Sequence, residues 1–385
     1  MAKISLNRLS RGASGLGSRI RGAGGGSLSA EGCDPGEDTI IRSYDRYKHT
    51  KTMMILVVLV LAIILFAVDI GLGAYRLGIA EVYGIIFDRI LNWIPVSDMT
   101  LDQIVVWEYR MPRVIVAILA GIGLAMAGAA MQSMMKNPLA DPYTTGISSG
   151  AAFGATLAIT LGITLLPGNY GTVVNAFVCS LIPAGFIILL STFRKPSPAM
   201  IILSGIALMY IFNAIQTYMM LIADPDAASS VYAWTVGTLS YASWSNIPFI
   251  LAVVIGGGIV LMYMARVLNT MNAGDSFAKS IGINVNHARI IVLITISILA
   301  AGIVSFTGII GFVGLVGPHI ARMFVGSDNK ILIPAAGLMG ACVMLLADCV
   351  VQLVGSSSIP VGIITSIIGG PLFMFLIIRQ KKEVW

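Results

Sequence analysis

The chain has 385 residues, of which 57% are hydrophobic and 11% charged, and its formal net charge is +6. A soluble domain carries about 25% charged residues, so this composition excludes an ordinary soluble protein and indicates several membrane spans. In such a protein a surplus of Lys and Arg is typical of cytoplasmic loops, and we expect no nucleic-acid binding.

Residues 1–50 differ from the rest of the chain, because they are rich in Gly, Ser and Arg and poor in bulky apolar residues. Such a segment buries too little apolar surface to fold alone. We therefore expect a disordered N-terminal extension over 1–50 and a transmembrane domain over 51–385. The first apolar run begins near Met53, too far along the chain for a secretory signal peptide.

Apolar runs follow one another along the transmembrane domain, and a span needs about 20 residues. The seventh and eighth runs share one stretch, broken only at residues 307–318, TGIIGFVGLVGP. The sequence therefore predicts an all-α polytopic membrane protein with about ten transmembrane helices. The expected spans are 53–75, 112–135, 144–166, 171–193, 199–223, 246–266, 288–309, 311–326, 331–354 and 359–379.

The positions of Lys and Arg orient these spans. With a cytoplasmic N-terminus and ten crossings, all but four of the 24 Lys and Arg residues fall in cytoplasmic segments. This agrees with the positive-inside rule, whereas nine crossings would place RQKK at residues 379–382 outside. We expect both termini in the cytoplasm and the protein in the cell membrane.

Residues 136–154, KNPLADPYTTGISSGAAFG, separate the second and third spans. Gly146, Gly150 and Gly154 recur every fourth residue, which gives one helix face a smooth strip for close helix packing. Gly121 lies in a similar row of small residues in the preceding span. A phosphate-binding loop would end in Gly-Lys-Ser/Thr, which the chain lacks, so we interpret the segment as a turn and a packing helix.

Ionisable residues inside a membrane are costly and are functional candidates. Asp348 lies deep in its span, and the sequence leaves open whether it is structural or lines a transport pathway. Asp69 lies near the outer end of the first span. No chain of acids, catalytic motif or Cys/His ligand cluster accompanies them, so we expect neither an enzyme nor a metal site.

Two arginines, Arg110 and Arg113, share one helix face at the outer end of the second span. They are either interfacial side chains beside an aromatic belt or cations that meet the acids of a docking partner.

The longest internal loop contains MNAGDSFAKSIGIN at residues 271–284. Its pattern predicts a short amphipathic helix, followed by a glycine turn, that packs on the protein or docks into a partner groove. We expect its apolar side to consist of Met271, Phe277, Ala278 and Ile281.

Five stretches of the chain together match the motifs of one family: residues 109–155, the segment 271–284, GIIGFVGLVGPHIAR at 308–322, LLAD at 345–348 and IPVGIITSIIGGPLFMFLI at 359–377. Through them the chain resembles the FecCD-type permeases, the membrane subunits of ATP-driven (ABC) importers for iron-siderophores, haem and cobalamin. The resemblance runs from about residue 53 to the C-terminus and leaves out the N-terminal extension.

The resemblance implies a type II ABC importer permease that forms a homodimer around a central pathway. Two ABC ATPase subunits would bind on the cytoplasmic side, and an extracellular or periplasmic substrate-binding protein would dock outside. The family's ATPase-coupling loop corresponds to Gly274, Asp275, Ala278 and Gly282.

Other positions take expected roles from the same resemblance. Arg110 and Arg113 correspond to arginines that dock the binding protein, while Gln352 stands where some relatives have a third arginine. The cytoplasmic constriction of the pathway corresponds to the segment that contains Pro198 and Ala199, which differs from the relatives.

We therefore expect a permease that moves a metal chelate across the membrane and binds no cofactor itself, while a partner subunit uses ATP. The alternative is an ion-coupled secondary transporter, and a structural or receptor-like membrane protein comes third. The sequence does not name the chelate, because apolar pathway walls encode little of its chemistry.

Overall fold

The computed structural model describes residues 35–92, 99–168, 170–354 and 359–379, which form helices joined by turns, with no strand among them. The elements are α1 (Pro35–Gly71), α2 (Ile79–Leu91), α3 (Leu101–Ile104), the π-helix η2 (Val105–Arg110), α4 (Met111–Met135), the 3-10 helix η3 (Pro142–Thr145), α5 (Ile147–Leu161), α6 (Gly171–Phe193), α7 (Pro198–Ile222), α8 (Pro225–Thr235), α9 (Ile247–Asn272), α10 (Asp275–Ser280), α11 (Val285–Thr307), α12 (Val313–Val325), α13 (Asn329–Leu353) and α14 (Val361–Arg379).

The predicted all-α membrane fold is confirmed. Within the described ranges, seven helical stretches are long and apolar enough to cross a membrane, and α5, α12 and α14 are shorter apolar helices. Each of them overlaps one of the ten expected spans. The break between the seventh and eighth spans falls between Thr307 and Val313, inside the stretch where the glycines predicted it.

Helix α1 begins at Pro35 and so includes part of the segment expected to be a disordered extension. Residues 1–34 of that segment lie outside the described residues, and the extension stays a prediction. The compact unit that contains the spans begins at Thr50 and runs to the C-terminal end.

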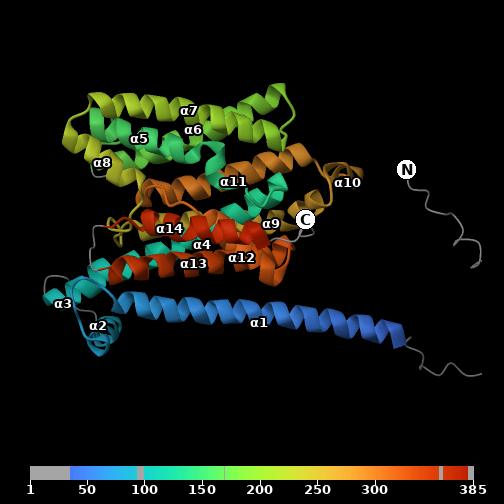
Figure 1. Ribbon diagram of the computed structural model, residues 1–385, viewed down its shortest axis with the longest axis horizontal. Coiled ribbons are helices and arrows are strands. Elements are labelled where there is room, and N and C mark those ends of the chain that lie inside the picture. The colour runs from blue at the N-terminus through green and yellow to red at the C-terminus, as the bar shows by residue number, and fades with distance from the viewer. Residues whose placement is uncertain (1–34, 93–98, 169, 355–358, 380–385) are drawn as a thin grey trace, which may run out of the picture. The chain divides into compact units, whose positions relative to one another are not determined.

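The short helices mark the two ends of the helix bundle (Figure 1). Helices α2, α3 and α8 lie at one end, which we call the α2 face, and α10 lies at the other, which we call the α10 face. The sequence predicted α10, whereas α2, α3 and α8 were not expected as helices.

Helix α4 is the centre of the packing and contacts α9, α11, α12 and α13. Of the most apolar stretch of this spanning helix, 83% is buried within the chain. The corresponding value is 17% for α1 and for α7. Helices α4 and α13 meet backbone to backbone, since a Cβ on Gly121 would overlap the carbonyl of Gly340, and a Cβ on Gly340 the carbonyl of Gly121. Small residues therefore allow the two helices to approach this closely.

Helix α5 packs on α6 through two of the three glycines singled out in the sequence. A Cβ on Gly150 would meet the backbone at Cys179, and one on Gly154 the backbone at Asn175. Gly146 has another place: its φ of 87° lies in the left-handed region, and it precedes the first residue of α5. It thus ends the turn that the prolines begin.

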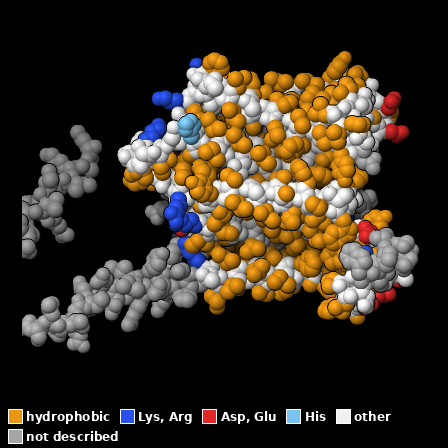
Figure 2. All heavy atoms as spheres, turned by 180° about the vertical axis from the view of Figure 1, so that it is seen from behind, with side chains coloured by type: hydrophobic (Ala, Val, Ile, Leu, Met, Phe, Trp, Pro, Cys, Tyr) orange, Lys and Arg blue, Asp and Glu red, His pale blue; other side chains and the backbone are white. Residues whose placement is uncertain are grey.

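The surface between the two faces is hydrophobic, as expected for contact with lipid. Figure 2 shows a broad apolar surface with Lys and Arg gathered at one end and Asp and Glu at the other. The described exposed cations near the α10 face include Arg194, Lys195 and Lys279, and the exposed acids near the α2 face include Asp88 and Asp226.

Candidate functional site

Two groups of polar side chains stand out in the described structure. One is a buried network that joins α1, α4 and α13 near the α2 face, and the other is an ion-pair cluster around α10. The residues singled out in the sequence are divided between them.

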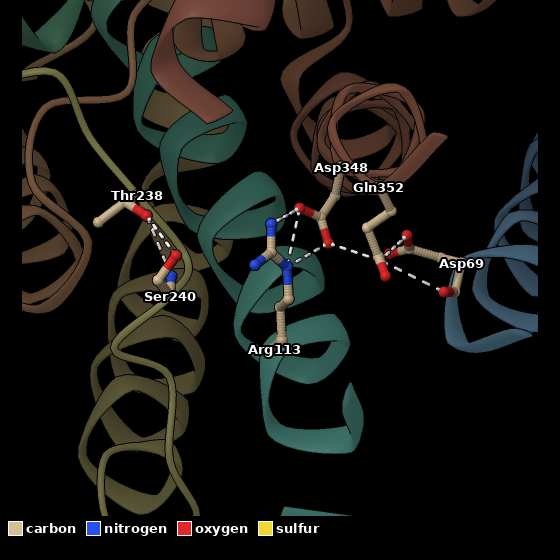
Figure 3. A network of polar contacts seen from close by, with 6 residues as sticks. All are labelled: Asp69, Arg113, Thr238, Ser240, Asp348 and Gln352. Atoms are coloured by element: carbon tan, nitrogen blue, oxygen red, sulfur yellow. Dashed lines mark hydrogen bonds and ion pairs between the residues drawn. The ribbon is translucent and has the colours of Figure 1, made fainter. Parts of the chain in front are cut away.

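The first group is built on an ion pair between Arg113 of α4 and Asp348 of α13 (Figure 3). The Arg113 Nε donates to Asp348 Oδ2 at 2.9 Å, and Nη2 donates to Oδ1 at 2.6 Å. The Asp348 side chain is fully buried and that of Arg113 is 14% exposed. This two-pronged geometry is the strongest form of arginine–carboxylate pairing. Asp348 therefore has a structural partner.

Gln352, one helical turn after Asp348, extends the network to α1. Its Nε2 donates to Asp69 Oδ1 at 2.7 Å and to Asp348 Oδ2 at 3.2 Å. Asp69 is fully buried, and its Oδ2 accepts no hydrogen bond from the described residues. The amide of Gln352 thus holds two carboxyl groups, of which only Asp348 has a guanidinium beside it in this part of the chain.

We expect Asp69→Asn to fold with nearly wild-type thermal stability. One guanidinium compensates one buried carboxylate, and the amide oxygen of Asn can still accept from Gln352. Asp348→Asn should be much less stable, because it leaves the Arg113 cation buried without its counter-charge. Thermal unfolding of both variants in the same detergent compares them directly, and equal losses of stability would contradict this charge assignment.

Arg110 also points inward. It is 6% exposed, and its Nη1 donates to the carbonyl oxygens of Ile70 at 3.1 Å and Gly71 at 3.2 Å, while Nη2 donates to that of Tyr75. A cation on the last carbonyls of α1 stabilises that helix end.

The docking role expected of Arg110 and Arg113 stays a prediction. Arg110 is buried and the Arg113 side chain is only 14% exposed, and both guanidinium groups are engaged in bonds within the chain. The interfacial interpretation does not describe them either, because both guanidinium groups bind within the chain.

The second group surrounds the start of α10. Gly274 and Gly282, with φ of 130° and 88°, make the turns on either side of this helix. Asp275 accepts from Lys136 Nζ at 2.9 Å and from Arg289 Nη2 at 2.7 Å. The helix is thereby tied to the end of α4 and the start of α11.

The Asp275 carboxyl is ionised at neutral pH. Its partial burial by itself raises the pKa, but the hydrogen bonds and charges of Lys136 and Arg289 outweigh burial and hold the pKa of Asp275 below its usual value. The ion pairs around α10 therefore persist across the physiological pH range.

The apolar side expected for this segment is split in two. Ala278 and Met271 are fully buried within this chain, whereas Phe277 and Ile281 are 52% and 56% exposed. A larger residue at Ala278 would displace α10 itself. A partner would meet Phe277 and Ile281.

The pathway candidates are not brought together. Asp348 belongs to the network near the α2 face, whereas Pro198 begins α7 near the α10 face, and Ala199 beside it is exposed. The carbonyl of Pro196, two residues before Pro198, accepts from Arg289 Nη1 at 2.9 Å. A pathway role for Pro198 and Ala199 stays a prediction.

Sequence reasoning missed Lys136, Arg289 and Gln352 as members of these groups. It also missed an uncharged hollow of about 480 Å³ on the α2 face, which the rings of Tyr170 and Trp234 line together with several serines. Among the described residues no three His, Cys, Asp or Glu side chains are grouped to hold a metal ion.

Several curated proteins are similar to this chain. The hemin transport system permease protein HmuU of Yersinia pestis is 34% identical over 72% of this chain and 84% of that protein. The Fe(3+)-citrate import system permease protein YfmE of Bacillus subtilis is 33% identical over 86% and 96%. The cobalamin import system permease protein BtuC of Halobacterium salinarum is 36% identical over 73% and 75%.

A solved structure has the same fold. It is an ABC transporter described as of metal-chelate type, in an inward-facing conformation, and it is 29% identical, with a TM-score of 0.75 over 86% of this chain and 100% of the solved chain. The helix arrangement described above is thus that of a type II ABC importer permease, as the sequence motifs implied. The FecCD transport family matches residues 59–379, which is most of the transmembrane unit, and the chain belongs to that family.

Proposed function

We propose that the chain is the membrane permease subunit of an ATP-driven importer that moves a metal chelate, such as an iron-siderophore, haem or cobalamin. The observation that carries this proposal is the family match over residues 59–379, joined to the close likeness to a metal-chelate type transporter. The similar permeases named above import hemin, ferric citrate and cobalamin, which share the character of bulky metal complexes.

The charge distribution supports an orientation in the cell membrane. Exposed Lys and Arg gather at one end of the bundle and Asp and Glu at the other (Figure 2). By the positive-inside rule the α10 face is cytoplasmic, and the α2 face is outside. Both termini then lie in the cytoplasm.

This orientation assigns the partners. An ATPase subunit binds at α10, where Phe277 and Ile281 offer exposed apolar side chains beside Lys279. The sequence has no Gly-Lys-Ser/Thr phosphate loop, so energy must come from that separate subunit. A second permease copy completes the pathway, with one ATPase for each copy, and a substrate-binding protein docks on the α2 face.

Reconstitution tests this function. The permease, its ATPase and its binding protein in liposomes should take up a radioactive ferric chelate only when ATP is present on the ATPase side. An ATPase with its phosphate-loop lysine replaced should assemble but support no uptake. Uptake by the permease alone, driven by a proton or sodium gradient, would identify the chain as a secondary transporter instead.

A further inference from the structure

Arg289 connects two segments of the α10 face that no other hydrogen bond between described residues joins. Its Nη2 donates to Asp275 Oδ2 at 2.7 Å, and its Nη1 donates to the Pro196 carbonyl at 2.9 Å. Asp275 is the first residue of α10, and Pro196 lies two residues before the start of α7. One guanidinium thus holds the beginnings of both helices.

The base of this connection is rigid. Arg289 lies in the second turn of α11, and 72% of the most apolar stretch of this helix is buried within the chain. The Arg289 side chain itself is 5% exposed, and its Nε has no hydrogen-bond partner among the described groups. Among the described residues, Arg289 therefore makes its side-chain hydrogen bonds through the two Nη atoms alone, and the Asp275 carboxylate compensates its charge.

The other end of the connection, the start of α7, is less buried within this chain than α11. Of the most apolar stretch of α7, only 17% is buried within this chain, compared with 72% for α11, so fewer contacts within the chain hold α7. A shift of its first turn costs less than a shift of α4 or α11. Three contacts hold the first turns of α7: the buried Ile201 side chain, the approach of Gly205 to the turn before α5, and the bond from Arg289 to Pro196.

We propose that Arg289 is a positioning residue that transmits a displacement of α10 to the start of α7. The inference rests on the proposed function, in which the ATPase moves α10. When α10 shifts, Asp275 carries the guanidinium with it, and the second Nη bond moves the Pro196 carbonyl and the first turn of α7. A lysine at this position cannot serve both partners in the same way, because its single ammonium lacks the fixed fork.

The test measures chelate transported per ATP hydrolysed in the reconstituted complex. Arg289→Lys should bind the ATPase and hydrolyse ATP like the wild type, while the transported amount per ATP falls by about tenfold, a typical size for coupling between two sites. Lys136→Gln is the matched control, because it removes the other cation from Asp275 and leaves the bond to Pro196 intact. Its transport ratio should fall much less than that of Arg289→Lys.

Two outcomes would overturn the proposal: a wild-type ratio in Arg289→Lys, or an equal fall in Lys136→Gln. If no complex forms or hydrolyses ATP even with the wild-type chain, it is the proposed function that fails. If Arg289→Lys does not assemble, spin labels at the exposed Ala199 in the first turn of α7 and Ser280 in α10, in the otherwise wild-type chain, replace it. Their separation should stay constant between the nucleotide-free and ATP-bound complexes, and a change in it would refute a shared movement.

Discussion

Replacing Arg113 with alanine is expected to lower the free energy of unfolding by about 3–5 kcal/mol, the usual effect of removing one partner of a buried ion pair. The variant leaves the fully buried Asp348 carboxylate without its guanidinium. Chemical unfolding of the purified protein in mild detergent, followed by circular dichroism, measures the change. Folded yield in membranes should fall with it.

The double variant Arg113→Met/Asp348→Leu separates charge from packing. It removes both charges and keeps apolar volume, so it should be more stable than either single variant. If the stability loss of the double variant equals the sum of the losses of the two single variants, the two side chains do not stabilise the protein through their interaction. If Arg113 serves only to dock a binding protein, Arg113→Ala should weaken that docking with no loss of stability.

Gly121→Leu is the second substitution with a large expected effect, a loss of about 3 kcal/mol from overpacking. A side chain at this position would overlap the backbone of α13 at Gly340, and neither backbone can move without separating the two helices. Thermal unfolding and folded yield should both fall.

Gly256→Leu is the control for this substitution. Gly256 lies in the spanning helix α9, and a Cβ there meets no atom within 4 Å. The control should therefore fold like the wild type. A similar loss at both positions would show that leucine in a spanning helix is itself harmful and that the crossing of α4 and α13 is not the cause.

The helices could be predicted because a membrane span consists of a run of consecutive apolar residues, which the sequence shows directly. Apolar runs and the glycines at 308 and 311 are local signals, and they predicted the ten apolar helices and the break before Val313. The turns around α10 were equally local, since Gly274 and Gly282 flank a six-residue helix.

The partners of the charged side chains could not be predicted in this way. Asp348 lies 235 residues from Arg113, and Asp275 lies 139 residues from Lys136. Nothing in the local sequence distinguishes Lys136 from other basic residues at the ends of spans. Only the fold shows which helix ends meet.

Which neighbour the apolar side of a short helix covers could not be predicted either, because this too depends on contacts between distant parts of the chain. The pattern of residues 271–284 predicts an apolar side, but it does not say which neighbour that side covers. The structure divides it, with Ala278 packed inside and Phe277 outside. Exposure to a partner therefore depends on how α10 packs on its own chain, which the local pattern does not contain.

The attachment of α1 has a consequence for biosynthesis. Gln352, which binds the Asp69 carboxyl, follows it by 283 residues. At a synthesis rate of about 5–20 residues per second, Asp69 waits roughly 15 to 60 s before this amide leaves the ribosome. During that interval the earliest span carries a carboxyl without its final partner. Arg110 can bind the last carbonyls of α1 about 40 residues after they are made, so the end of this helix is held early, whereas its buried carboxyl receives its partner only when α13 is complete.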